Sequence, residues 1–181
     1  MDVSAEGRSG LVHIYCGDGK GKTTAGMGLC IRAAGHGYKV LICQFMKDNS
    51  SGELEVMRQI PGITVLPGPD REQFSFQMTP RQKEEKKRFF KQRILRAFRQ
   101  AQEEACSMLF LDEVLYAVGA GLLDEELVIT SLRNRPPHLE VILTGQDPSD
   151  RLLELADYVS RIGKIKHPYD RGIPARPGIE M

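Results

Sequence analysis

Residues 17–24 combine residue types that suit the binding of phosphate groups. In order they are Gly17, Asp18, Gly19, Lys20, Gly21, Lys22, Thr23 and Thr24. Glycines allow backbone N–H groups to turn toward an anion, Lys22 supplies a positive charge, and the Thr23 hydroxyl can reach a magnesium ion. An apolar run typical of a buried strand precedes the loop at 11–16, and a helical pattern follows at 25–34. The sequence therefore predicts a phosphate-binding loop between a strand and a helix.

This loop is one residue shorter than the standard P-loop pattern. That pattern places a glycine five residues before the Gly-Lys pair, where this chain has Cys16, so that the first glycine is Gly17. A shortened loop can still hold phosphates, but it need not hold them as an ordinary ATPase does.

A pair of acids, Asp112 and Glu113, ends another apolar run. A carboxylate at the end of a buried strand lies at the carboxyl edge of a parallel sheet, where such sheets bind ligands. We expect Asp112 or Glu113 to hold magnesium there, directly or through water. An alternative, compatible with the first, is that Asp112 caps a helix that starts at Glu113.

Apolar runs alternate with helical patterns along the whole chain. Strands are expected at 11–16, 39–45, 63–66, 108–111, 140–144 and 158–162, and further helices at 51–59, 79–106, 113–120, 124–134 and 148–157. This alternation predicts an α/β protein of three layers, with a mostly parallel central sheet of about six strands. We expect a flexible tail at 1–10, one P-loop domain at 11–181, and an extended, non-helical arm from 163 onward.

Composition narrows the classes of partner. The 181 residues carry a formal net charge of +1, which gives no overall field for nucleic acid or membranes, and no apolar run is long enough to span a bilayer. The polar N-terminus lacks the layout of a signal peptide, so we expect a cytoplasmic protein.

We interpret the basic residues of the 79–106 helix as a solvated face, with a nucleic-acid surface as the alternative. They are Arg81, Lys83, Lys86, Lys87, Arg88, Lys91, Arg93, Arg96 and Arg99.

Taken together, these motifs resemble the ATP:corrinoid adenosyltransferases, also called cob(I)yrinic acid a,c-diamide adenosyltransferases. The resemblance covers 12–180 and includes the shortened loop. Its segments are 17–24, 32–37, 44–47, 111–116, 143–145, 155–157 and 166–173. It implies a P-loop NTPase fold of the RecA-like kind.

The resemblance also implies an activity. Members of this family transfer the 5′-deoxyadenosyl group of ATP to the cobalt of a reduced cob(I) corrinoid and release triphosphate. By similarity, the catalytic residues are Lys22, Thr23 and Glu113, and Lys22 with the loop amides stabilises the leaving triphosphate. Thr23 and the Asp112–Glu113 pair would hold Mg²⁺ or Mn²⁺, and Thr24 and Arg32 would contact the nucleotide.

Two phenylalanines in the segment 67–78 match family positions that lie under the corrin and displace its lower axial ligand. They are Phe74 and Phe76, and the second departs from the family, which has tryptophan there, because this chain contains none. A second departure is Gln146, where relatives often carry arginine. The resemblance further implies an electron donor such as a reduced flavoprotein, and a homodimer.

Two other functions remain open at this point. In a conventional P-loop ATPase, Glu113 would activate water and the products would be ADP and phosphate. A nucleotide-dependent binding module would instead dock RNA or DNA on the basic helix, with strongly salt-dependent affinity.

Overall fold

Six parallel strands form the centre of the molecule. The computed structural model describes residues 9–47, 51–68 and 78–180. The strands are β1 (Val12–Cys16), β2 (Val40–Gln44), β3 (Ile63–Val65), β4 (Met108–Asp112), β5 (Glu140–Thr144) and β6 (Tyr158–Arg161). They lie in the order β3-β2-β4-β5-β1-β6, and every neighbouring pair is parallel. The predicted parallel sheet is confirmed, and all its carboxyl ends lie at one edge.

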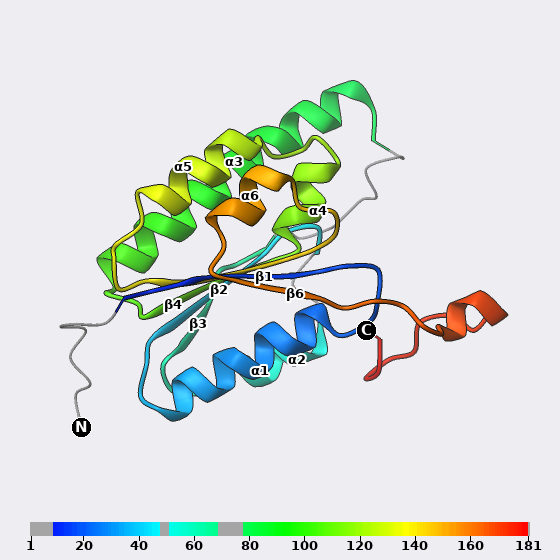
Figure 1. Cartoon of the computed structure of the whole chain (residues 1–181), viewed down its shortest axis with the longest axis horizontal. Helices are drawn as coiled ribbons and strands as arrows, with labels where there is room; N and C mark the ends of the chain where they lie inside the picture. The colour runs from blue at the N-terminus through cyan, green and yellow to red at the C-terminus, as the bar shows by residue number, and fades with distance from the viewer. Residues whose placement is uncertain (1–8, 48–50, 69–77, 181) are drawn as a thin grey trace.

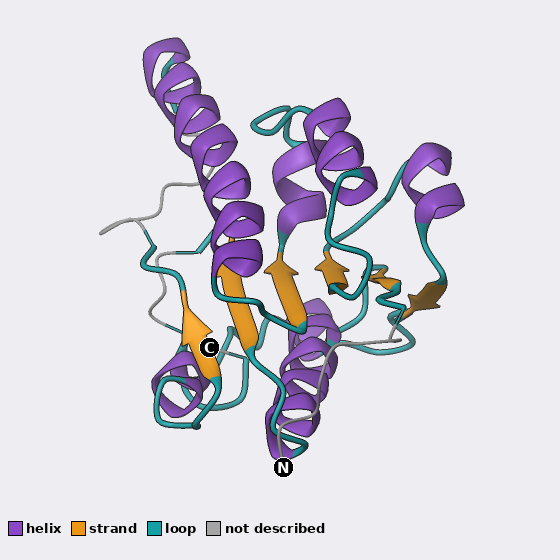
Figure 2. Ribbon diagram, turned by 90° about the vertical axis from the view of Figure 1, so that its left-hand side faces the viewer, coloured by secondary structure: helices purple, strands orange, loops and turns teal. Residues whose placement is uncertain are grey.

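Helices cover both faces of this sheet and complete the three layers (Figure 1). The first face carries α1 (Lys22–Gly35) and α2 (Gly52–Met57). The opposite face carries α3 (Pro80–Glu103), α4 (Val114–Gly119), α5 (Glu125–Arg133) and α6 (Asp150–Leu155). Figure 2 shows the long α3 extending beyond the ends of the strands that it covers.

The central strands are buried because both of their faces are covered. Every residue of β2, β4 and β5 is buried, as expected of parallel strands between two helical layers. Alternate residues of a strand therefore belong to two hydrophobic cores, one on each face of the sheet. Leu109 packs under α3 and α5, and Phe110 packs under α1. At Gly26 of α1, a Cβ would lie 2.4 Å from the Phe110 ring, so glycine lets the helix approach the sheet closely.

Local sequence signals set the helix boundaries. Helix α3 begins with a capping box, in which Thr79 and Gln82 bond each other's backbone N–H, and Pro80 occupies its first turn. Helix α1 starts at Lys22, three residues earlier than its apolar pattern predicted, because the loop lysine and threonines form its first turn.

At both ends of the chain the structure differs in part from the expected flexible tail and non-helical arm. The expected tail at 1–10 falls mainly outside the described residues, but Gly10 is buried and its N–H bonds the Pro137 carbonyl at 2.7 Å, so Gly10 belongs to the folded body. The arm after β6 was expected to contain no helix, and this is wrong for one turn, the 3-10 helix η2 (Pro168–Arg171). Proline at its start and Gly172 in the left-handed conformation at its end account for that turn.

Candidate active site

The glycine loop joins β1 to the N-terminus of α1, and two of its glycines adopt conformations that other residues avoid. Gly17 has φ 110° and Gly21 has φ 122°. At Gly17 a Cβ would also lie 2.4 Å from the Ile162 carbonyl oxygen. The residues directly after β6 hold the loop in place, because Gly19 N–H donates to the Ile162 carbonyl at 2.8 Å and Lys164 N–H donates to the Asp18 carboxylate at 3.0 Å.

Lys22 lies on the first turn of α1, where free N–H groups and the helix dipole favour an anion. Its ammonium donates to the Gly19 carbonyl at 2.8 Å, so it is folded back on the loop. Burial lowers the pKa of Lys22, and the nearby Glu113 carboxylate opposes that effect. The charge of Lys22 and the free N–H groups of this helix end suit an anion such as a phosphate group.

Asp112 is fully buried and accepts hydrogen bonds from four side chains. Its Oδ1 accepts from the Thr23 hydroxyl at 2.9 Å and from the Thr144 hydroxyl at 2.7 Å. Its Oδ2 accepts from Gln44 Nε2 at 3.0 Å and from Lys47 Nζ at 3.1 Å. The alternative that Asp112 caps α4 is wrong, because the N-cap of that helix is Glu113 and no side chain caps it.

Glu113 faces the cavity from a left-handed backbone conformation, with φ 59°. Its N–H donates to the Thr144 hydroxyl at 2.8 Å, and its Oε1 lies 3.4 Å from Lys47 Nζ. Burial raises the pKa of Glu113 to about 7, although Lys47 opposes the shift. Thr144 thus connects both acids, because it donates to one and accepts from the backbone of the other.

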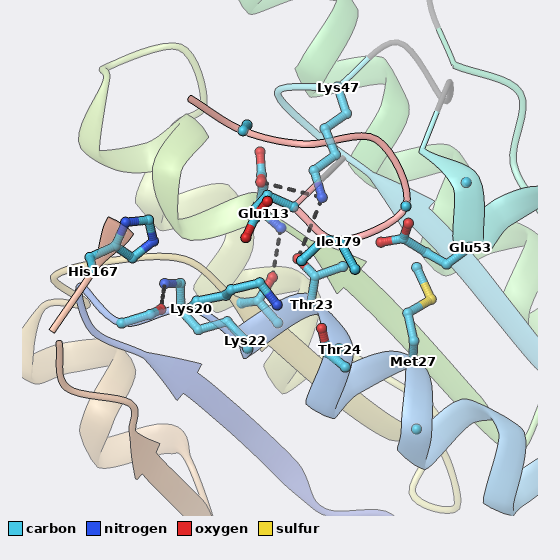
Figure 3. Close-up of a pocket in the computed structure, with 18 of the residues that line it drawn as sticks. Lys20, Lys22, Thr23, Thr24, Met27, Lys47, Glu53, Glu113, His167 and Ile179 are labelled. Atoms are coloured by element: carbon cyan, nitrogen blue, oxygen red, sulfur yellow. Dashed lines mark hydrogen bonds and ion pairs between the residues drawn. The ribbon is translucent and has the colours of Figure 1, made fainter. Parts of the chain in front are cut away.

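Lys47 also lines this cavity, although its residue type and spacing alone did not predict it. It follows β2, and its ammonium lies within 3.4 Å of oxygen atoms of Thr23, Asp112 and Glu113. Figure 3 shows the Lys47 side chain reaching toward Thr23 and Glu113. Burial alone would lower the pKa of Lys47, but the carboxylates of Asp112 and Glu113 outweigh it and the pKa is raised. The available signal was its place in the segment 44–47, one of those that carry the family resemblance.

Lys22, Lys47 and Glu113 line a cavity of about 1030 Å³, at the upper end of the range for small-molecule sites. One wall is the loop with α1, a second is α2, and a third is the C-terminal arm (Figure 3). The lining side chains include Met27, Ile31, Lys47, Glu53, Val56, Met57, Glu113, Tyr116, His167, Tyr169, Ile173, Ile179 and Glu180.

Most expected site residues meet at this cavity. Of the loop, the stretch from Asp18 to Thr24 lines it, while Gly17 lies buried behind. Asp112 also lies behind the wall, in contact with Thr23.

Two other residues singled out in the sequence, Arg32 and Gln146, do not line the cavity. Arg32 is exposed in the last turn of α1, and the half-buried Gln146 lies elsewhere. Phe74 and Phe76 lie outside the described residues.

The oxygen atoms of the site fit a hard divalent cation. Thr23 offers a hydroxyl, and Asp112 and Glu113 offer carboxylates, which are ligands that Mg²⁺ prefers. Gln44 Oε1 is buried beside Asp112 and accepts no hydrogen bond from the described residues, so it is available to a water of a metal's shell. Within the described ranges, no group of three or more His, Cys, Asp or Glu side chains forms a metal centre on its own.

The basic face of α3 differs from the expectation at one residue. Arg93 is buried and donates to the carbonyls of Gln44 at 2.7 Å and Pro67 at 2.5 Å, so it is not part of a solvated face. Others of the set pair with acids one turn away. These pairs are Arg81 with Glu85, Lys87 with Glu84 and Arg99 with Glu103.

The loop, the parallel sheet and the acid at the end of β4 place this chain among proteins with the P-loop NTPase fold. A solved structure of EssC (ATPases 2 and 3) from Geobacillus thermodenitrificans is similar over 93% of this chain and 35% of that one, with a TM-score of 0.50 and 17% identity. That likeness concerns the fold alone.

The family is narrower than the fold. The family model of ATP:corrinoid adenosyltransferase BtuR/CobO/CobP matches residues 8–181, and the chain belongs to this family. The corrinoid adenosyltransferase of Escherichia coli (strain K12) is 32% identical, over 98% of this chain and 89% of its own length. Corrinoid adenosyltransferase CobA of Salmonella typhimurium (strain LT2) is 33% identical over the same shares.

The resemblance predicted from the motifs is thereby confirmed, and with it the class of enzyme: an ATP:corrinoid adenosyltransferase. None of the helices within 9–47, 51–68 and 78–180 has both the length and the apolar character needed to cross a lipid bilayer.

Proposed function

We propose that this chain transfers the 5′-deoxyadenosyl group of ATP to the cobalt of a reduced cob(I) corrinoid and releases inorganic triphosphate. The observation that carries the proposal is the shortened loop 17–24, which opens with Lys22 and Thr23 on a cavity large enough for more than phosphate groups. Family membership supplies the substrate class. ATP is the adenosyl donor and the corrinoid is the acceptor.

The bonds exchanged define what the protein must do. The electron pair of cob(I) forms a bond to C5′ of the nucleotide, the C5′–O bond breaks, and triphosphate leaves with that electron pair. No side chain acts as the nucleophile, since the cobalt of the substrate carries that role. The protein must hold ATP with C5′ exposed and stabilise negative charge on the leaving group.

The residues at the loop can meet these demands. Lys22 and the loop amides would bind the triphosphate, and their contacts strengthen as its charge grows. Thr23, Asp112 and Glu113 would hold Mg²⁺ or Mn²⁺, which neutralises phosphate charge when it is bound. Thr24 lies one residue beyond on the same helix turn and lines the cavity. Arg32, at the far end of α1, would reach the nucleotide only from outside the cavity described above.

Corrinoid binding and reduction complete the proposal. Phe74 and Phe76 would lie under the corrin and displace its lower ligand, which makes cob(II) easier to reduce. An electron donor such as a reduced flavoprotein would supply the electron in the cytoplasm, and the enzyme would act as a homodimer, with 11–181 as one domain.

Product identity tests the proposal against an ordinary ATPase. The purified protein is incubated with ATP, Mg²⁺ and chemically reduced cob(I)alamin without oxygen, and both the corrinoid spectrum and the phosphate product are recorded. A light-sensitive adenosylated corrinoid together with triphosphate is the expected result. ADP and phosphate, with no change in the corrinoid, would overturn it.

A further inference from the structure

The ammonium of Lys47 lies among the oxygens that would hold the metal. Its Nζ is 3.1 Å from Asp112 Oδ2, 3.4 Å from Glu113 Oε1 and 3.4 Å from the Thr23 hydroxyl. The carboxylate of Asp112 is fully buried, and the side chains of Lys47 and Glu113 are only 25% and 23% exposed. Figure 3 shows the lysine entering from the end of β2, opposite α1.

This position explains how two adjacent acids coexist in a protected site. When Glu113 is ionised, its carboxylate and that of Asp112 repel each other unless a cation lies close to both. The loop lysine does not supply that charge by contact, because Lys22 Nζ donates to the Gly19 carbonyl. Lys47 therefore balances the acids in the nucleotide-free protein.

The same contacts conflict with a bound metal. A divalent cation on Thr23 and the two acids would share its ligands with the Lys47 ammonium, and like charges at such distances repel strongly. Lysine has a flexible four-carbon stem and three rotatable donors, so Lys47 can move while its backbone stays in place. It already lines the cavity on which the phosphate loop opens, which gives the ammonium a place to go.

We propose that Lys47 is a resident counter-ion that exchanges with the divalent metal. Without nucleotide, its ammonium holds Thr23, Asp112 and Glu113 and keeps free metal ions out. When a metal–nucleotide complex enters, the metal takes those oxygens and the ammonium moves to the triphosphate. Metal and ATP therefore enter together. This inference rests on the proposed metal site but not on corrinoid chemistry.

Manganese binding to the nucleotide-free protein tests whether Lys47 keeps free metal ions out of the site. The EPR signal of free Mn²⁺ is followed while the wild type, Lys47→Met and Lys91→Met are titrated. Lys91 is exposed on α3, so its substitution removes the same charge from the protein surface. We expect Lys47→Met to bind Mn²⁺ about tenfold more tightly or better, with no gain in Lys91→Met. The double variant Lys47→Met/Glu113→Gln should lose most of the gain.

Several outcomes would overturn this role of Lys47. Wild type that binds Mn²⁺ as tightly as Lys47→Met, or an equal gain in Lys91→Met, would show that Lys47 does not guard the site. Thermal unfolding checks that each variant is folded, and Lys47→Gln replaces Lys47→Met if the latter is not. Lys47→Arg, which keeps the charge, should bind Mn²⁺ as weakly as the wild type.

Nucleotide binding tests whether the Lys47 ammonium moves to the triphosphate. With Mg²⁺ present, Lys47→Met should bind ATP about tenfold more weakly, because the triphosphate loses a charged donor. Unchanged affinity would show that the ammonium does not move to the phosphates. Neither titration contains a corrinoid, so failure of adenosyl transfer and failure of the exchange are separate results.

Discussion

The hydroxyl of Thr23 donates a 2.9 Å hydrogen bond to Oδ1 of Asp112, which ties the first turn of α1 to the end of β4. Because the proton of that hydroxyl points at the buried carboxylate, the oxygen keeps its lone pairs for a cation. Lys47 donates to the same oxygen at 3.4 Å. The Thr23 side chain is thus held in one orientation before any ligand arrives, which would suit the proposed metal, and the loop is linked to the sheet.

Replacing Lys22 tests the phosphate cradle. Lys22→Ala should lower adenosyl transfer to pre-reduced cob(I)alamin by about 100-fold or more, because the leaving triphosphate loses its charged donor. The measurement is the rate of formation of the light-sensitive corrinoid, with Lys91→Ala as the exposed control. Wild-type turnover by Lys22→Ala would exclude this role.

Asp112 should contribute strongly to stability as well as to the site. Asp112→Asn replaces one acceptor oxygen with an NH₂ group that would face the donors Gln44 or Thr144 and weakens the pairing with Lys47. We expect the free energy of unfolding to fall by about 2–4 kcal/mol, as for other broken buried networks. Urea unfolding measures it. Asp170→Asn, in an exposed pair with Lys164, is the control and should change little. Equal effects of the two substitutions would show that the network contributes little.

The raised pKa of Glu113 predicts a pH dependence of stability. Its pKa moves from 4.5 in the unfolded chain to about 7 in the folded protein. Between these values the folded state holds a proton that the unfolded state has lost, so this contribution to stability is present at low pH and is lost as pH rises to about 7.

The glutamine side chain of Glu113→Gln cannot titrate, so the free energy of unfolding of this variant should rise relative to that of the wild type as pH rises. Between pH 5 and pH 7.5 the difference in unfolding free energy should shift in favour of the variant by on the order of 2 kcal/mol. Urea unfolding without metal or nucleotide measures it, with the exposed Glu84→Gln as control. A difference that does not vary with pH would contradict the shift.

Sequence patterns could predict the meeting of loop and acid but not all its partners. Parallel strands bring their carboxyl ends to one edge, so the contact between the 17–24 loop and Asp112 followed from the order of elements. Lys47 reaches Asp112 because β2 lies beside β4, with Gln44 opposite Asp112 in register. Local sequence patterns do not predict which strands are neighbours in the sheet, so they could not predict this contact. Arg93 shares the spacing of solvated basic residues, and only tertiary packing buries it.

The two phenylalanines of the segment 67–78 carry a prediction about reduction. Phe74→Ala should slow reduction of cob(II)alamin more than transfer to pre-reduced cob(I)alamin, because removal of the lower ligand matters only for the reduction step. Anaerobic assays that start from each oxidation state measure the two rates. Phe76→Trp restores the family pattern and serves as the conservative comparison. Equal losses in both assays would refute a role in ligand displacement.

Arg93 should anchor the segment in which these phenylalanines lie. Its guanidinium donates to the Gln44 carbonyl at the end of β2 and to the Pro67 carbonyl after β3. Arg93→Met keeps the apolar stem but withdraws these donors, so the free energy of unfolding should fall by about 2–3 kcal/mol. Arg96→Met, on the exposed face of the same helix, should stay within about 0.5 kcal/mol of the wild type.

The kinetic effect of Arg93→Met should fall on the corrinoid. Pro67 lies shortly before Phe74, whereas no residue of α3 lines the cavity on which the loop 17–24 opens. The KM for corrinoid should therefore rise more than the KM for ATP. Steady-state assays at saturating levels of the other substrate separate the two. Two results would show that Arg93 does not position this segment: a loss of unfolding free energy in Arg93→Met no larger than in Arg96→Met, or an equal rise of both KM values.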